Sequence, residues 1–250
     1  MKKKIIIILT IFNDASNLVK LLPKIYKIIS STDFELLIAD DSYNKIKTRS
    51  ILRNFQYKNI ILIQRNKLSD YVEKCLATRK AMEYIYKKKG RDFEFVTEID
   101  SDGAQSPSDI KRGFNQALNQ NIDLFIFSKY KKDSLVYNRD IKRILISKTV
   151  TYICKKIFTN KISDYTNSFR IYNKKCLKIL IKNKIMFTGA IQHIQNLLCL
   201  INYSIKIKEI KCIYIEDRNR KSVISYRELF RSFIDFSILV FRKKFIHTKY

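Results

Sequence analysis

The stretch KIIIILTIFND, residues 4–14, sets the pattern that the first half of the chain repeats. Residues 4–11 form an apolar run rich in β-branched isoleucine, which is typical of a strand buried on both faces. Asn13 and Asp14 end the run, and apolar residues then recur at helical spacing, which predicts a helix directly after the strand. The residues with this spacing are Leu18, Leu21, Leu22, Ile25, Ile28 and Ile29.

The same order of strand and helix continues along the chain. Further strands are predicted at 34–39, 59–63, 93–99 and 123–127, and further helices at 70–88, with Val72, Cys75, Leu76, Met82 and Ile85 facing inward, and from near Pro107. Strands that alternate with helices over more than a hundred residues predict an α/β fold with a doubly wound, mostly parallel sheet.

Length and composition favour one domain. The chain has 250 residues, of which 46% are hydrophobic, and only 4 Gly and 2 Pro. A chain of this length buries a full core as one α/β domain. Since no linker-like segment divides it, we expect one domain over residues 1–216 and a C-terminal extension over residues 217–250.

The extension contains a segment, residues 225–245, with two interpretations. Its apolar residues fall near one side of a helix, and cations accompany them. It is either a basic amphipathic helix on an anionic membrane surface or a helix packed on the sheet that ends in solvated lysines. The apolar residues are Leu229, Phe230, Phe233, Ile234 and Leu239; the cations are Arg227, Arg231, Arg242, Lys243 and Lys244.

The N-terminal MKKKIIIILTIF lacks a small-residue cleavage site and is too short to span a bilayer. No other segment reaches the roughly 18 apolar residues of a membrane helix. We therefore expect a soluble or peripheral protein in the cytoplasm, on the inner face of the membrane. The five cysteines form no CxxC pair, which predicts buried free thiols in a reducing compartment. They are Cys75, Cys154, Cys176, Cys199 and Cys212.

A formal charge of +27, from 50 basic and 23 acidic residues, raises the alternative of a nucleic-acid-binding module. The lysines are scattered, however, and no helix-turn-helix, zinc-finger or RNP-like pattern accompanies them. Nucleic acid is therefore not the expected partner.

Acidic residues gather where the predicted strands end. Asp14, Asp40 with Asp41, and Asp100 with Asp102 follow three strands, and in open α/β sheets ligands bind at the carboxyl ends of strands. Asp100 and Asp102 stand two residues apart, so in extended backbone both point to one side. Two converging carboxylates suit Mg²⁺ or Mn²⁺. The alternative is that they cap the helix near Pro107.

Other chemistries find no support in the sequence. No GxGxxG or GxxxxGK[ST] motif is present, which argues against dinucleotide-binding and P-loop enzymes. The two histidines, His193 and His247, lie in an apolar helical stretch and in the C-terminal tail, and we interpret both as structural or solvated.

Several separated motifs, in one order, resemble the dolichyl-phosphate mannose synthase branch of the family 2 glycosyltransferases, which have the GT-A fold. The segments IIIILTIFNDASNL, LLIADDSYN and EIDSDGAQSPSDI are similar to its donor-site motifs, with Ala104 where some members have a third metal-ligating Gln. DIKRILISK (140–148) and above all SDYTNSFRIYNKKCL (163–177) match the second half. EDRNRKSVIS (216–225) resembles a basic segment, in which Arg218 or Arg220 takes the family's arginine position.

The resemblance implies a reaction and a set of site residues. The reaction is inverting transfer of a hexose, mannose or glucose, from a GDP- or UDP-sugar to polyprenyl phosphate. Asp100 and Asp102 would hold Mg²⁺ or Mn²⁺ on the donor diphosphate as the catalytic and metal-binding pair. The donor-site positions are Thr10, Phe12, Asp14, Asp40 and Asp41; the acceptor-phosphate positions are Lys129, Arg143, Arg170 and Arg218.

A polyprenyl phosphate is already an anion at neutral pH and needs no general base, which suits a chain without an obvious catalytic histidine. Two alternatives stay open. The first is a family 2 enzyme that acts on a saccharide hydroxyl in surface-polysaccharide assembly. The second is a non-catalytic relative, given the glycines that the motifs have lost.

Overall fold

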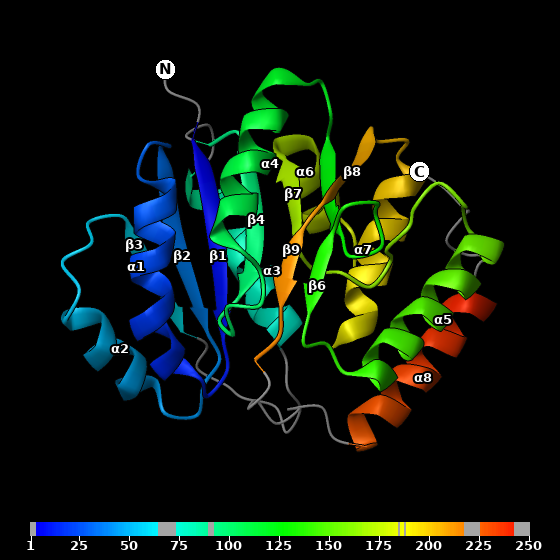
Figure 1. Cartoon of the computed structure of the whole chain (residues 1–250), viewed down its shortest axis with the longest axis horizontal. Helices are drawn as coiled ribbons and strands as arrows, with labels where there is room; N and C mark the ends of the chain where they lie inside the picture. Colours follow the sequence, from blue (N-terminus) through cyan, green and yellow to red (C-terminus); the bar gives the residue numbers. More distant parts are fainter. Residues whose placement is uncertain are drawn as a thin grey trace.

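A seven-stranded sheet runs through the centre of the computed structural model, which describes residues 4–64, 74–89, 93–184, 186–187, 189–217 and 226–242 (Figure 1). The strand order is β3-β2-β1-β4-β7-β5-β8. The strands are β1 (Ile5–Ile11), β2 (Phe34–Asp40), β3 (Ile60–Gln64), β4 (Phe95–Asp100), β5 (Leu124–Ser128), β7 (Arg170–Asn173) and β8 (Ile207–Lys211). The predicted α/β fold with a mostly parallel sheet in a single domain is confirmed.

β1 lies inside the sheet, and all seven of its residues are buried. It pairs in parallel with β2 on one side and β4 on the other. The register places Ile11 beside Asp40 and Thr10 beside Asp100. The acidic residues that end these strands therefore meet at one edge of the sheet, as predicted.

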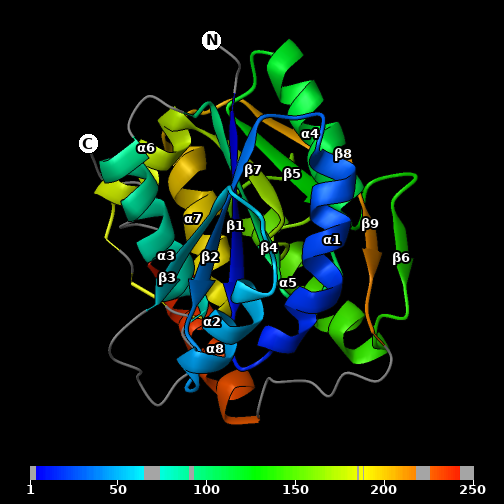
Figure 2. The same ribbon diagram turned by 90° about the vertical axis from the view of Figure 1, so that its left-hand side faces the viewer.

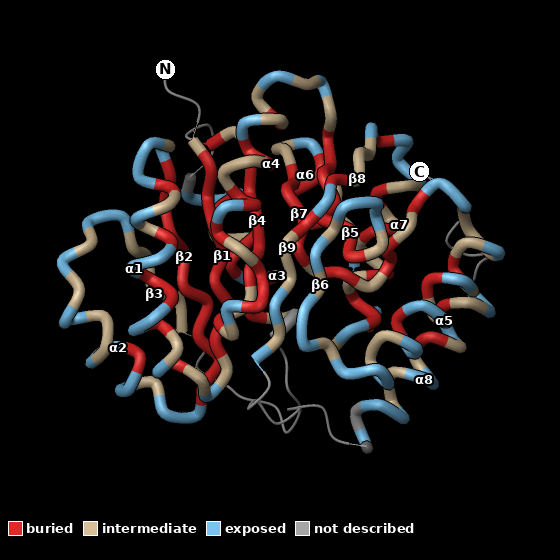
Figure 3. Tube along the Cα trace, viewed as in Figure 1, coloured by how far each residue is buried: buried red, intermediate tan, exposed pale blue. Residues whose placement is uncertain are grey.

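Helices cover both faces of the sheet (Figure 2). One face packs on α1 and α4, and the other on α3, α6 and α7, so two separate apolar cores form. Figure 3 shows buried backbone concentrated in the sheet between these layers. The helices are α1 (Leu18–Ile29) after the 3-10 turn Ala15–Asn17, α2 (Lys45–Arg53), α3 (Lys74–Tyr84) with a π-helical turn Ile85–Lys89, α4 (Pro107–Asn119), α5 (Ile141–Ile157), α6 (Lys174–Lys182), α7 (Ala190–Asn202) and α8 (Tyr226–Phe241).

The predicted helices agree with this arrangement where they are described. The helix expected over 70–88 is observed from Lys74 to Lys89, with Met82 and Ile85 buried. Val72 and the side chain of Cys75 lie outside the described part, and Leu76 is half-buried. The helix expected near Pro107 begins at that residue.

One strand departs from the parallel pattern. β7 runs antiparallel between β4 and β5. Its four residues are too few to show a period of their own, so the sequence did not reveal a strand there. A second, two-stranded sheet pairs β6 (Leu135–Tyr137) with β9 (Ile213–Ile215) in front of the carboxyl edge.

The cysteines are free thiols where the structure describes them, as predicted, and Cys154, Cys176 and Cys212 are buried. Burial raises the pKa of each of these three thiols to about 12. Cys154 and Cys176 belong to the core on the α6–α7 face, and Cys212 to the core on the α1–α4 face.

The C-terminal helix α8 packs against α7 through Phe236 and Leu239, which are buried in the core. Its other apolar residues stay on the surface: Leu229, Phe230, Phe233 and Ile234 are exposed. Over the described ranges, none of the helices has the length and apolar character needed to cross a bilayer.

Gly113 gives a test of core packing. A Cβ at this position would lie 2.6 Å from Phe127 Cζ and 2.7 Å from Ile171 Cδ1, and both side chains are fully buried. Ala favours a helix over Gly by about 1 kcal/mol, but overpacking costs about 1–3 kcal/mol. We expect Gly113→Ala to lower the free energy of unfolding by up to about 2 kcal/mol in urea titrations. Asn115→Ala, at an exposed site of α4, is the control and should not destabilise; a stabilised Gly113→Ala would contradict the packing.

Candidate active site

The acidic turn after β4 is built around Gly103. This residue adopts φ +72°, a left-handed conformation that glycine enters without strain. Asp102 Oδ1 accepts a hydrogen bond of 3.0 Å from the Ala104 amide, and Gln105 Oε1 accepts one of 2.8 Å from the Asp100 amide. The turn therefore fixes the backbone of both aspartates before any ligand binds.

Tyr214 on β9 shows where the two carboxylates lie. The Ile215 amide donates to Ala104 O at 2.8 Å, and Tyr214 bridges to Gln105, so β9 is held against the acidic turn. Burial raises the pKa of the Tyr214 hydroxyl, and the nearby charges of Asp100 and Asp102 raise it further. The charges of both carboxylates therefore act on one hydroxyl.

The donor set fits a hard divalent cation. Two carboxylates provide oxygen ligands, which Mg²⁺ and Mn²⁺ prefer, and leave positions for phosphate oxygens and water. Across the described ranges, no group of three or more His, Cys, Asp or Glu side chains is arranged to hold a metal. The pair Asp100 and Asp102, with Ala104 in place of a third ligand, is therefore the set that this edge offers.

Cations also lie close to Tyr214. Arg139 is 5.3 Å and Lys129 Nζ 5.6 Å from the centroid of its ring. Arg139 and Arg143 both approach Glu216, at 4.0 and 3.3 Å. These cations come from the end of β5, from the loop before α5 and from α5 itself, and Arg143 keeps 39% of its side chain exposed.

The end of β1 is joined to the same edge through Asp14. One of its carboxylate oxygens accepts the Phe12 amide at 3.0 Å and the other accepts Ser101 Oγ at 2.5 Å. Asn13, at φ +58°, bonds Ser42 Oγ and the Tyr43 amide. These bonds tie the loops after β1, β2 and β4 together.

Phe12 and Tyr43 form the aromatic part of this edge. Their rings meet edge to face at 5.6 Å, and Tyr43 is 62% exposed. An exposed aromatic ring beside carboxylates is a surface on which a nucleobase can stack.

Asp40 and Asp41 are buried beneath this surface, at 1% and 0% exposure. Asp40 accepts hydrogen bonds from the Ser42 amide at 2.9 Å and from Gln64 Nε2 at 2.8 Å. Thr10 is also buried, and its hydroxyl has no hydrogen-bond partner within the described part of the chain. In this structure Asp40 therefore shapes the loop after β2.

Lys129 lies in the core, where its Nζ is 2.8 Å from Asp164 Oδ2 and both side chains are almost fully buried. Asp164 also accepts the amides of Lys129, Thr166 and Asn167, each at 3.1 Å. Burial alone would raise the pKa of Asp164, but Lys129 and these hydrogen bonds hold it below its ordinary value. An acceptor phosphate would reach Lys129 only by displacing Asp164.

Arg170 is fully buried as well. Its guanidinium donates to His193 O at 2.8 Å and to Tyr165 O at 3.2 Å, on the α7 side of the sheet. His193 in turn lies 3.5 Å from Glu98, which places this histidine in a buried polar cluster, in line with the structural interpretation. Arg218 lies outside the described residues.

The edge therefore gathers most of the predicted residues but also some that the sequence did not reveal. Ser101 and Gln105 stand inside the acidic segment but were not singled out, whereas Tyr214, Arg139 and Glu216 are far from it in the sequence and no spacing connects them to it. The signal that was available is the short apolar run Ile213–Ile215 followed directly by Glu216, which indicates a strand that ends on a charge.

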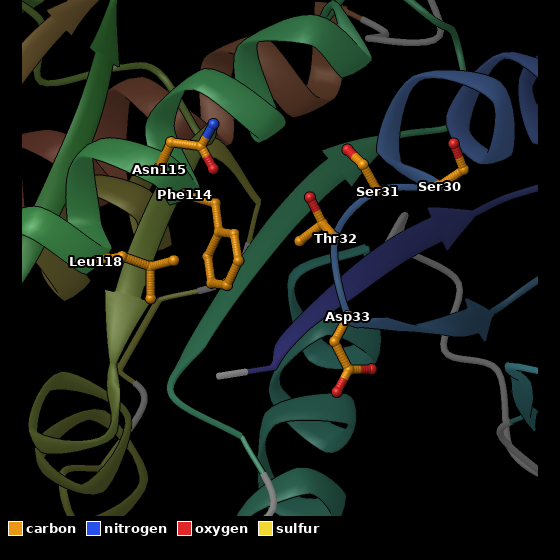
Figure 4. Close-up of a pocket in the computed structure, with 7 residues that line it drawn as sticks. All are labelled: Ser30, Ser31, Thr32, Asp33, Phe114, Asn115 and Leu118. Carbon is orange, nitrogen blue, oxygen red and sulfur yellow. The ribbon is translucent and has the colours of Figure 1, made fainter. Parts of the chain in front are cut away.

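A separate pocket of about 680 Å³ lies at the other edge of the sheet. Figure 4 shows residues of α4 on one side of it and the turn before β2 on the other. Since that turn begins β2 whereas Asp40 ends it, the pocket is remote from the acidic turn. Its lining residues are Ser30, Ser31, Thr32, Asp33, Phe114, Asn115 and Leu118.

The sequence matches a known protein family over most of its length. The family model described as "Glycosyl transferase family 2" matches residues 6–180. The chain belongs to this family. The match includes β1, β2 and the acidic turn after β4, so the candidate site lies mainly inside it. The predicted family 2 membership is confirmed, whereas the dolichyl-phosphate mannose synthase branch stays a prediction.

Solved structures agree with a GT-A fold for this family 2 glycosyltransferase. Glucosyl-3-phosphoglycerate synthase from Mycobacterium tuberculosis, in complex with Mn²⁺, UDP and phosphoglyceric acid, has a TM-score of 0.66 at 13% identity, over 95% of this chain and 78% of that one. Its complex with Mg²⁺ and UDP gives 0.66 at 14% identity, over 95% and 79%. A mycobacterial protein gives 0.67 at 12%, over 95% and 74%. These identities show the fold alone.

Among curated proteins, the tRNA modification GTPase MnmE of Rickettsia rickettsii and Rickettsia conorii is 34% identical over 91 residues. The match covers 35% of this chain and 19% of the GTPase, so the chain spans about a fifth of the relatives' length. A GTPase needs a phosphate-binding P-loop, and this sequence has no such motif. The match carries no functional inference.

Proposed function

We propose that the protein transfers a hexose, mannose or glucose, from a UDP- or GDP-sugar to polyprenyl phosphate with inversion at the sugar carbon. The observation that carries the proposal is the turn after β4, which fixes Asp100 and Asp102 at the carboxyl edge of the sheet, where the charges of both raise the pKa of the Tyr214 hydroxyl. The fold and the family 2 match support a nucleotide-sugar donor.

The pair Asp100 and Asp102 would hold Mg²⁺ or Mn²⁺ on the donor diphosphate. When bound, the ion supplies Lewis-acid stabilisation of the departing nucleoside diphosphate. Complexes of the structurally similar glucosyl-3-phosphoglycerate synthase contain Mn²⁺ or Mg²⁺ together with UDP, and one contains UDP-glucose, which supports this choice of donor and metal.

The donor nucleoside would lie at the ends of β1 and β2. Phe12 and Tyr43 offer an aromatic surface for the base, and Asp14 holds the Phe12 loop and the acidic turn together. Asp40, Asp41 and Thr10 are buried at the same strand ends, so their predicted contact with the donor would require the surrounding loops to open.

The acceptor phosphate would approach the cations close to Tyr214. Arg143 is partly exposed there, its guanidinium offers a two-pronged contact to phosphate, and Arg139 stands beside it. Lys129 and Arg170 are both buried, and they would contribute indirectly by holding the segment between α5 and β7 in place through Asp164 and Tyr165. An anionic acceptor needs no general base, so the engagement of His193 with Glu98 does not hinder the reaction.

The reaction can be tested with radiolabelled UDP-glucose and GDP-mannose, extracted bacterial polyprenyl phosphate, and Mn²⁺ or Mg²⁺. We expect label in the organic phase and less than about one hundredth of it after EDTA treatment, because the diphosphate then leaves without its counter-charge. Label in the aqueous phase alone would reject a lipid acceptor and favour transfer to a saccharide hydroxyl. Activity that survives EDTA would reject the metal.

A further inference from the structure

One side of α8 is buried and the other is an exposed row of aromatic rings. Phe236 and Leu239 lie in the core, at 7% and 1% exposure. Phe230, Phe233 and Phe241 are 66%, 68% and 84% exposed. Phe233 and Phe241 follow Phe230 by three and by eleven residues, which places all three rings on one face of the helix. Single exposed apolar residues are ordinary, but a row of phenylalanines indicates a binding surface.

α5 carries a second exposed apolar row at the same end of the molecule. Ile141, Leu145 and Tyr152 are 73%, 59% and 61% exposed and stand at helical spacing. In Figure 1 α5 overlaps α8 along the same diagonal at the right-hand side, and Figure 2 shows α5 nearer to the β6–β9 side and α8 nearer to the α3 side of that end of the molecule. We name these two exposed rows together the α5–α8 surface.

Most charges around this surface are positive, although Asp140 precedes α5 and Asp235 pairs with Arg231 on α8 at 3.9 Å. α5 contains five Lys or Arg residues and no acid. Lys142, Lys148 and Lys156 are exposed, and so are Arg227 and Arg242 at the two ends of α8. Apolar rows flanked by cations match the chemistry of an anionic lipid surface, where rings enter the acyl boundary and ammonium groups meet phosphates.

The α5–α8 surface also reaches the candidate active site. The Asp140 carboxylate caps the first turn of α5 by accepting the Arg143 amide at 3.1 Å. Arg143 contacts Glu216 beside Tyr214, whereas Ile141 and Leu145, two positions away on either side, point to the opposite face of the helix. The first turn of α5 therefore has the arginine of the site on one face and exposed apolar side chains on the other.

We propose that the α5–α8 surface adsorbs to an anionic bilayer, with the phenylalanines of α8 inserted and the lysines of α5 at the lipid headgroups. α8 has 16 residues, so it is about 24 Å long and lies flat in the interface rather than crossing it. Given the proposed lipid acceptor, adsorption would hold the first turn of α5, and with it the candidate active site, beside the bilayer that contains the prenyl phosphate.

A second copy of the chain is the competing occupant of the α5–α8 surface, and charge disfavours it. A two-fold contact places identical patches face to face, so the cations of α5 and the ends of α8 would oppose their own copies. The formal charge of +27 adds repulsion between the two chains.

The experiment is flotation with phosphatidylcholine vesicles, with and without phosphatidylglycerol, in the absence of sugar donor and metal. We expect the protein to float only with the anionic vesicles. Phe230→Ser/Phe233→Ser should reduce the vesicle-bound fraction about tenfold, and Lys142→Gln/Lys148→Gln/Lys156→Gln at least as much, since each lysine contributes roughly fivefold.

Control variants on other helices test whether the loss of vesicle binding is specific to the α5–α8 surface. Ile46→Ser removes an exposed apolar side chain on α2, and Lys20→Gln/Lys24→Gln/Lys27→Gln removes three exposed cations from α1; both should float like the wild type. Circular dichroism melting checks that every variant is folded. Equal flotation of the phenylalanine variant and the wild type would overturn the proposal. A wild-type dimer that this variant converts to a monomer, without vesicle binding in either, would assign the surface to a second copy.

Failure of this inference and failure of the proposed reaction are separable. Transfer to a short, water-soluble prenyl phosphate needs no membrane, so the phenylalanine variant should retain it at the wild-type rate. Vesicle binding without any transfer would reject the reaction alone. Transfer to the short acceptor without vesicle binding would reject the membrane surface alone.

Discussion

Asp102→Asn is expected to reduce sugar transfer about a thousandfold while leaving the fold intact. An asparagine oxygen can still accept the Ala104 amide, so the turn after β4 keeps its geometry. The negative charge that would face the metal is lost, and a metal contribution of several kcal/mol corresponds to about three orders of magnitude in rate. Transfer rates with Mn²⁺ measure the effect, and Mn²⁺ titration followed by electron paramagnetic resonance should show weaker binding.

The matched control is Asp133→Asn. Asp133 is exposed and has φ +66°, a conformation that asparagine adopts readily, so this variant makes the same chemical change away from the site. It should transfer sugar at the wild-type rate. Asp102→Asn with unchanged activity would show that the acidic turn does not hold the catalytic metal.

Lys129→Met is expected to destabilise the protein by about 3–5 kcal/mol, because it leaves the carboxylate of Asp164 buried and unpaired. For a chain of this size the loss corresponds to a melting temperature lowered by about 10 °C. Differential scanning calorimetry measures it. The control is Lys131→Met, which makes the same change at an exposed position two residues further along the chain and should change the melting temperature little.

The double variant Lys129→Met/Asp164→Asn separates the charge effect from packing. With both charges removed, no unpaired ion remains in the core, so its stability should exceed that expected from adding the two single losses. Strictly additive losses would show that the two side chains do not interact. Sugar transfer by the double variant, measured below its melting temperature, also tests whether Lys129 has any direct contact with the acceptor.

The same pair predicts how stability depends on pH. The folded-state pKa of Asp164 lies below its ordinary value of 3.8, so the carboxylate stabilises the fold at pH values above 3.8. That contribution is lost as the pH falls through the lower, folded-state pKa. Asp164→Asn should lack this part of the acid transition in pH-dependent urea unfolding.

The sequence predicted the centre of the fold because its strands are long, apolar and end on acids. β1 and β4 needed no tertiary information, and their parallel order followed from the helices between them. β7 could not be found in this way, since four residues carry no readable period and the antiparallel direction is imposed by β4 and β5 on either side.

The candidate site was predicted in part for the same reason. The acids at the strand ends are local features, so Asp14, Asp40 and Asp100 appear at the expected edge. Tyr214 reaches the acidic turn only because β9 returns to it from a distant part of the sequence. The burial of Lys129 depends on Asp164, which the loop after α5 supplies, and a charge count along the sequence cannot distinguish a buried lysine from a surface one.

The buried thiols make the protein a reporter of its own local opening. Thiolate is the reactive form, and pKa values near 12 leave Cys154, Cys176 and Cys212 almost inert to alkylation at neutral pH in the native state. Pulsed alkylation followed by mass spectrometry would therefore measure separately the rates at which the two helical layers open. Modification of Cys212 marks exposure of the α1–α4 layer, and modification of Cys154 or Cys176 marks exposure of the layer on which α8 rests.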